Sequence, residues 1–231
     1  MHIHSCLSPC AHDEMTPWNL VGMAKVQGLD VIALTDHNAA LNVPQAALAG
    51  AHYGVEVIPG MEITTREEVH LLAYFDTVAA ALQFDEAIRK HLPMIPNRAG
   101  LFGNQIIIGD DDEPVGTLEP MLLNATDLSV DEAEALVKTF GGVCVPAHIN
   151  RGVNGMIGAL GLMPELPKYP VVEVYRRAPC APYATQGRFL LYASDAHRLE
   201  DIAERNFSLE VPEPTAKAVL ALLRAKQSAT L

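Results

Sequence analysis

The residues of this chain that are best suited to chemistry are histidines and carboxylates, and the spacing of some of them indicates that their side chains share one face. The chain opens MHIHSCLSPC, where His2 and His4 alternate around Ile3. In an extended strand successive side chains point to opposite faces, so both imidazoles would share one face while the isoleucine enters a core. The opening strand could therefore present two ligands to a metal ion.

Other ionisable residues lie at the ends of short apolar runs that are rich in β-forming residues. These runs are VIALTDH (31–37), VEVIPGME (55–62), VHLLAYF (69–75), GVCVPAH (142–148), VVEVY (171–175) and LLYASDAH (190–197). The residues at their ends include His37, His148 and His197, with Asp36, Glu62 and Asp195. The C-terminal ends of strands in a parallel barrel form one active-site face. We therefore expect these residues to converge on a shared metal site.

Helical stretches separate many of these runs. In TPWNLVGMAKVQG, Thr16 can cap a helix that starts at Pro17 and stops at Gly28. In SVDEAEALVKTFGG, Ser129 and Glu132 have the spacing of a capping box. Strands that alternate with helices indicate an α/β fold with parallel strands and right-handed crossovers.

One segment, from about residue 91 to 127, breaks this alternation. It contains PMIPNRAGLFGN and the acidic stretch GDDDEPVG. Its apolar residues need a surface to cover, so we expect an irregular insertion that roofs the mouth of the site and turns its acidic run to solvent.

Composition sets the wider limits. A chain of 231 residues with 49% hydrophobic residues fits a single domain over 1–231, and no apolar run is long enough to cross a bilayer. The formal charge of −12 opposes binding to nucleic acid or to an anionic membrane. The four cysteines form no CxxC pair and the first residues lack a basic, apolar signal, so we expect a cytoplasmic protein.

Imidazole and carboxylate donors without thiolate suit zinc, manganese or iron, and so many donors could hold more than one ion. The positive charge of several divalent ions would exceed the negative charge of the few carboxylates around them, so the site would be locally positive. A phosphate could then bind inside an acidic protein.

The motifs that carry a family resemblance are, in order, HIHSCLSP, MTP, ALTDHN, IPGMEIT with VHLLAYF, PAHINR and ASDAH. With them the chain resembles the PHP (polymerase and histidinol phosphatase) domain family, in its branch of free-standing phosphoesterases. The resemblance covers nearly the whole chain. It implies a distorted (β/α)7 barrel, a trinuclear centre of two to three divalent transition-metal ions (Zn, Mn or Fe), and hydrolysis of phosphate esters.

The resemblance also assigns roles to individual residues. His2 and His4 match the HxH ligands, Glu62 the carboxylate that bridges two metals, and Asp36 a residue that orients a ligand. The remaining matches to metal ligands are His37, His70, His148, Asp195 and His197, and we place Glu62, Asp195 and His197 in catalysis. One further ligand falls at His12 or Asp13, which are adjacent, and spacing leaves both open. Arg151 matches an arginine that contacts the substrate phosphate.

The sequence thus predicts an enzyme, a metal-dependent phosphoesterase, in which a metal-bound hydroxide attacks phosphorus. We expect a small phosphorylated substrate, such as a nucleotide-like or histidinol-phosphate-like monoester. A short oligonucleotide is compatible, whereas long nucleic acid and membranes are not expected partners. Two alternatives are a non-catalytic PHP module that binds metal or adds stability, and a metal-dependent hydrolase of C–N bonds. Against the last, no strand-end lysine is evident to bridge two metals.

Overall fold

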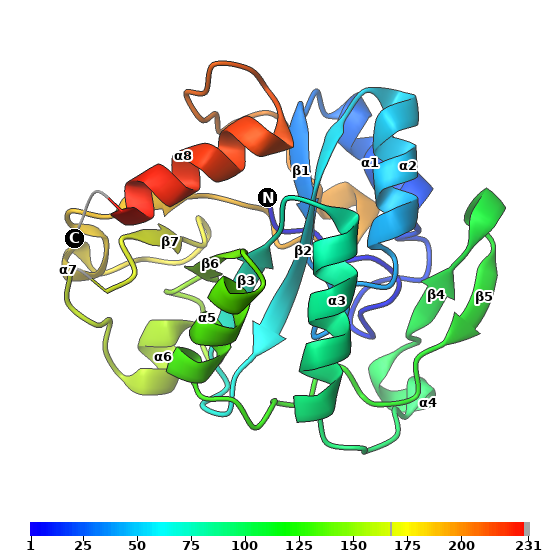
Figure 1. The fold of residues 1–231 in the computed structure, drawn as a ribbon, viewed down its shortest axis with the longest axis horizontal. Coiled ribbons are helices and arrows are strands. Elements are labelled where there is room, and N and C mark those ends of the chain that lie inside the picture. The colour runs from blue at the N-terminus through cyan, green and yellow to red at the C-terminus, as the bar shows by residue number, and fades with distance from the viewer. Residues whose placement is uncertain (167, 229–231) are drawn as a thin grey trace.

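The computed structural model describes residues 1–166 and 168–228, and its fold is mixed α/β (Figure 1). The helices are α1 (Pro17–Val26), α2 (Val43–Tyr53), α3 (Val78–Ile88), α4 (Ala99–Phe102), α5 (Val130–Thr139), α6 (Met156–Leu160), α7 (Pro182–Thr185) and α8 (Ala216–Ser228). The strands are β1 (Val31–Leu34), β2 (Glu56–Thr64), β3 (His70–Tyr74), β4 (Ile106–Ile108), β5 (Pro114–Thr117), β6 (Val143–Pro146), β7 (Val171–Glu173) and β8 (Phe189–Leu191). Short 3-10 turns cover Arg89–His91, Asp110–Asp112 and Leu199–Asp201.

The helix-capping residues predicted from the sequence make the expected hydrogen bonds. Thr16 accepts a hydrogen bond from the backbone of Asn19 at the start of α1, where Pro17 occupies the first turn. At α5, Ser129 and Glu132 form both hydrogen bonds of the capping box. None of the helices within the described residues is long and apolar enough to cross a membrane.

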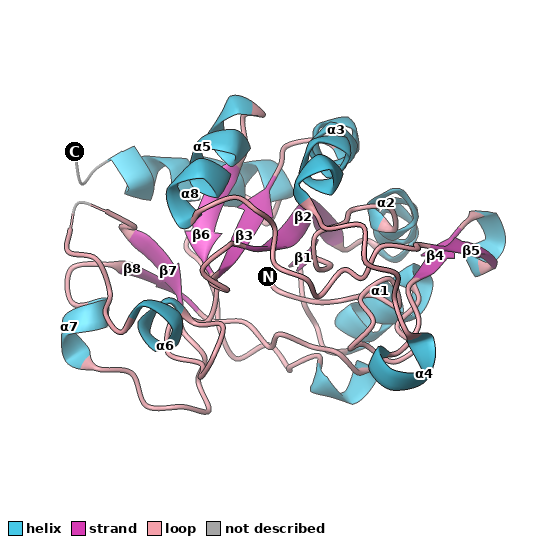
Figure 2. Ribbon diagram, turned by 90° about the horizontal axis from the view of Figure 1, so that it is seen from below, coloured by secondary structure: helices cyan, strands magenta, loops and turns pink. Residues whose placement is uncertain are grey.

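The strands form three separate sheets rather than the closed barrel that the resemblance implies. The largest sheet has the order β1-β2-β3-β6, while β7 pairs with β8 and β4 pairs with β5. Ile3 makes single bridges to Leu34 and Ala196, so the opening segment lies between β1 and the chain that follows β8. Helices α8, α5, α3, α2 and α1 form an arc around the four-stranded sheet (Figure 2).

The expectation of parallel strands holds for only part of the sheet. β1 pairs with β2 in parallel and β7 with β8 in parallel, but β3 is antiparallel to both β2 and β6. The reason is the short connection between β2 and β3, since the five residues 65–69 are too few for a crossover helix. As a result His70 begins β3 beside Thr64, close to where β2 ends.

The predicted insertion is ordered and packs beside the opening loop. Gly103 lies against the Pro9 carbonyl, Ile106 accepts a hydrogen bond from Asn42, and Thr16 donates to Asp112 of the acidic run. Leu92 and Leu122 are buried against Leu7 and Ala39, while Met94, Ile95 and Leu101 stay exposed. The insertion therefore packs against the loop that carries His12 and Asp13, and some of its apolar residues remain exposed to solvent.

Candidate metal centre

Glu62 lies at the middle of a buried group of histidines. It is 1% exposed, and nitrogens of five histidines come within 3.3 Å of its two carboxylate oxygens. The two shortest distances to Oε1 are those from His70 Nδ1 (2.8 Å) and from His148 Nε2 (3.0 Å). The other three histidines are His2, His4 and His37.

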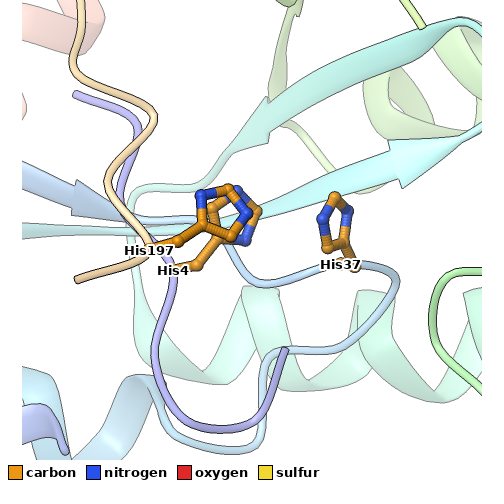
Figure 3. Close-up of side chains that lie close together, drawn as sticks. All are labelled: His4, His37 and His197. Carbon is orange, nitrogen blue, oxygen red and sulfur yellow. The ribbon is translucent and has the colours of Figure 1, made fainter. Parts of the chain in front are cut away.

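The opening segment and the loop after β8 supply a second part of the group. Asp195 Oδ1 lies 3.1 Å from His4 Nε2 and 3.3 Å from His2 Nε2. The His197 ring stacks on the His4 ring, with 4.3 Å between centroids. Figure 3 shows His4 and His197 side by side and His37 across from them. Ile3 explains this arrangement, because its bridges to β1 and to Ala196 align the neighbouring histidines with Asp195 and His197.

Three overlapping sets of donor atoms could each hold a metal ion. They are His2, His4, Glu62 and Asp195; His37, Glu62 and His70; and His4, His37 and His197. Within each set the donor atoms lie within 4.8 Å of one another. Because the sets share Glu62, His4 and His37, a cluster of ions is geometrically possible.

The electrostatics of the group favour lone pairs that are free to bind a cation. Burial lowers the pKa of His70, drives that of His37 well below its ordinary value and brings that of His197 to about 2, so these rings are neutral at pH 7. Burial would raise the pKa of Glu62, but the surrounding histidines outweigh it and hold that carboxyl ionised. His2 differs, because Glu173 and Glu62 outweigh its burial and raise its pKa to about 9.

Unsatisfied polar atoms also fit bound metal ions. His148 Nδ1 is buried and finds no hydrogen-bond partner in the described part of the chain, and Glu62 Oε2 and His37 Nδ1 lie 3.0 Å apart without the geometry of a hydrogen bond. Such orphans are rare in folded proteins and point to a bound ion or water. His148 and Asp195 also have positive φ values of 25° and 49°, and backbone strain of this kind clusters at functional sites.

Asp36 does not touch the histidines directly, but it reaches His4 through a serine. Its carboxylate accepts hydrogen bonds from the hydroxyls of Ser5 (2.6 Å) and Ser8 (2.7 Å). The Ser8 oxygen lies 3.1 Å from His4 Nδ1, and therefore accepts from that nitrogen. This chain leaves His4 Nε2 free to face Glu62 and Asp195, which fits the orienting role proposed for Asp36.

Sequence reasoning missed Glu173, the last residue of β7. It is 2% exposed, and its Oε1 lies 2.9 Å from His2 Nδ1. The signal was a single carboxylate inside the apolar run VVEVY, since a buried charge requires a partner.

His12 and Asp13 lie outside the three donor sets. The His12 side chain is 44% exposed and 3.6 Å from Glu14, and Asp13 accepts a hydrogen bond from Asn104 of the insertion. The His12 backbone nevertheless donates to the His197 carbonyl, so this loop runs beside the centre. That one of the pair is a ligand remains a prediction.

Separate alanine substitutions of His12 and Asp13 test this prediction. We expect one of them to remove about one ion per chain, because a ligand lost from a three- or four-donor site weakens that site most. Metal content after reconstitution is the measurement, with both proteins checked for folding by circular dichroism. Full metal content in both variants would show that this loop supplies no ligand.

Arg151 and the nearby Arg176 make different contacts. Arg151 is about half exposed, contacts the Asp195 carboxylate and stacks 5.2 Å from the Tyr175 ring centroid. Arg176 instead packs over Tyr192 and hydrogen-bonds Asn206, so it has a structural role.

Comparison with known proteins places this geometry in a family. Residues 1–149 match the PHP domain. The chain belongs to the PHP domain family. All of the candidate ligands except Asp195 and His197 fall within the matched residues.

Proteins similar to this PHP chain are named for different activities. A 5'-3' exoribonuclease of Haemophilus influenzae is 30% identical over 115 residues, which are 48% of this chain and 39% of that protein. The lesion-specific endonuclease PfuEndoQ of Pyrococcus furiosus superposes with a TM-score of 0.66 at 18% identity, covering 99% of this chain and 55% of that one. An amidohydrolase of Chromobacterium violaceum superposes with a TM-score of 0.58 at 18% identity, covering 97% of this chain and 95% of that one. The chain spans only about two fifths of its curated relatives, 39% and 44%.

These relatives contradict the expectation of a small phosphorylated substrate without long nucleic acid. One relative is an exoribonuclease, and a structure of endonuclease Q holds a 27-mer duplex substrate with an abasic lesion at the active site. The physical error was to argue from the net charge of −12. Local charge at the binding site, rather than the average over the surface, decides whether a phosphate backbone can approach.

Proposed function

We propose that this PHP chain is a metal-dependent phosphoesterase that cleaves phosphodiester bonds of nucleic acid. The observation that carries the proposal is Glu62, an ionised buried carboxylate within 3.3 Å of five histidines. A carboxylate in this position can bridge ions, and the surrounding imidazoles complete a donor set typical of zinc, manganese or iron. The exoribonuclease and endonuclease relatives support nucleic acid as the substrate.

The proposed ligands are those that the structure gathers around Glu62. They are His2, His4, His37, Glu62, His70, His148, Asp195 and His197. Two to three bound divalent ions would supply Lewis acidity to the phosphate ester and acidify a water. The protein itself positions the donors, keeps His37, His70 and His197 unprotonated, and excludes bulk water from the floor of the site.

Arg151 is the proposed contact for the substrate phosphate. Its side chain is about half exposed, and contacts with Asp195 and Tyr175 hold its guanidinium beside the donor group. A planar guanidinium can bind two phosphate oxygens at once and stabilise charge that develops on them.

Replacement of Arg151 by alanine should therefore lower kcat/KM by about 10²-fold while metal content stays unchanged. Steady-state kinetics on an oligonucleotide, together with elemental analysis, measure both. Arg177→Ala is the matched control, since Arg177 is exposed and belongs to none of the three donor sets. Equal loss in the two variants, or a loss of metal in Arg151→Ala, would contradict the role.

The activity itself is tested with the metal-loaded protein. Oligonucleotides of RNA and DNA, single-stranded and duplex, are labelled at either end and incubated with protein reconstituted with Mn²⁺ or Zn²⁺. We expect shortened products from at least one of them, and none after chelation. Intact substrates throughout, with metal bound, would overturn the proposal and leave the non-catalytic module or the C–N hydrolase.

A further inference from the structure

Glu173 is a buried carboxylate that none of the three donor sets uses. It ends β7, is 2% exposed, and lies where β7 brings an otherwise apolar run against the histidines. Burial of an ionised group is costly unless it is paired and hydrogen-bonded, so a structure that retains one there uses it for a specific contact.

Its contacts join two segments of the centre. Glu173 Oε1 lies 2.9 Å from His2 Nδ1, and the same oxygen accepts a hydrogen bond of 3.1 Å from the backbone N–H of His148. One carboxylate oxygen thus connects the opening segment to the loop after β6. The other oxygen is buried and finds no hydrogen-bond partner among the described residues.

The direction of the His2 contact determines which nitrogen is free. An imidazole that binds a metal keeps only one ring proton, and when that proton lies on Nδ1 and is donated to Glu173, the Nε2 lone pair points the opposite way. There it lies 3.3 Å from Glu62 Oε1 and 3.3 Å from Asp195 Oδ1. His4 is held in the same sense, with Nδ1 against Ser8 and Nε2 toward the same two carboxylates.

We propose that Glu173 is a positioning residue of this centre, which fixes the tautomer and ring orientation of His2 and thereby raises the affinity for metal ions. The inference rests on the proposed metal centre but not on the nature of the substrate. A carboxylate behind a ligating histidine also makes that imidazole a stronger donor, and removal of such a partner typically weakens metal binding by about 10–100-fold.

The first test compares metal affinity in Glu173→Gln with that of the parent. The amide keeps the volume of the side chain and an acceptor oxygen but loses the charge. Competition with a chromophoric chelator for Zn²⁺ should show binding weakened about 10–100-fold. Glu86→Gln makes the same chemical change on the exposed face of α3 and should leave the affinity unchanged. Equal affinities in a folded Glu173→Gln protein would overturn the proposal.

A second measurement needs no variant. Nitrogen-15 NMR of the Zn²⁺-loaded parent should show a proton on Nδ1 of His2 and a metal-shifted Nε2. A metal-bound Nδ1 would overturn the proposal even if Glu173→Gln fails to fold. Absence of metal binding by the parent would instead defeat the proposed function, and absent nuclease activity with weakened binding in the variant would leave the role of Glu173 intact.

Discussion

Glu62→Gln is expected to lower phosphodiester hydrolysis by on the order of 10³-fold, the largest effect of any single substitution in this chain. The physical reason is that Glu62 belongs to two of the three donor sets and that five histidines surround its carboxylate. The amide removes the negative charge from the middle of the group while its volume is nearly unchanged. Fewer cations are then held, and those that bind are placed less well.

Initial rates on a labelled oligonucleotide and metal content by elemental analysis together measure this effect. Glu86→Gln provides a matched change at an exposed position and should behave like the parent. Near-normal turnover of folded Glu62→Gln would mean that the chemistry takes place elsewhere on the molecule.

Metal loading is expected to raise the unfolding temperature by about 10 °C. A ligand at a thousand times its Kd stabilises the folded state by about 4 kcal/mol, and each kcal/mol shifts the Tm of a domain of this size by about 2–4 °C. The donors come from the opening segment, β2, β3 and the loops after β1, β6 and β8, so bound ions would link segments that are far apart in the chain.

Differential scanning calorimetry with Zn²⁺ or Mn²⁺, followed by a chelator, gives this shift. Ca²⁺ serves as the control cation because it prefers oxygen ligands and the group is mainly imidazole. An unchanged Tm with transition metals, or an equal shift with Ca²⁺, would contradict a built site for these ions.

The sequence was enough to predict which histidines and carboxylates lie close together, because these residues follow simple periodicities. Two histidines that alternate around Ile3 must share a face, and the residues that end apolar runs collect at one edge of a sheet. The direction of β3 was not accessible in this way, because hydrophobic pattern is the same for a strand in either direction. The short link at residues 65–69 was the better guide.

Side-chain partners were harder to predict than positions. Glu173 follows two valines and resembles any polar residue in a strand, and only the fold brings it 2.9 Å from His2. Closure of the barrel is likewise a property of pairing between distant strands. The predicted closure is absent because β7 and β8 pair with each other and not with β6 or β1.

The most direct test of the central claim is anomalous diffraction from crystals of the protein reconstituted with Zn²⁺, recorded on both sides of the zinc absorption edge. We expect two to three peaks around Glu62, each within about 2.0–2.2 Å of imidazole nitrogens or carboxylate oxygens of the proposed ligands. A map with no anomalous peak among these residues, from protein that elemental analysis shows to carry zinc, would contradict it.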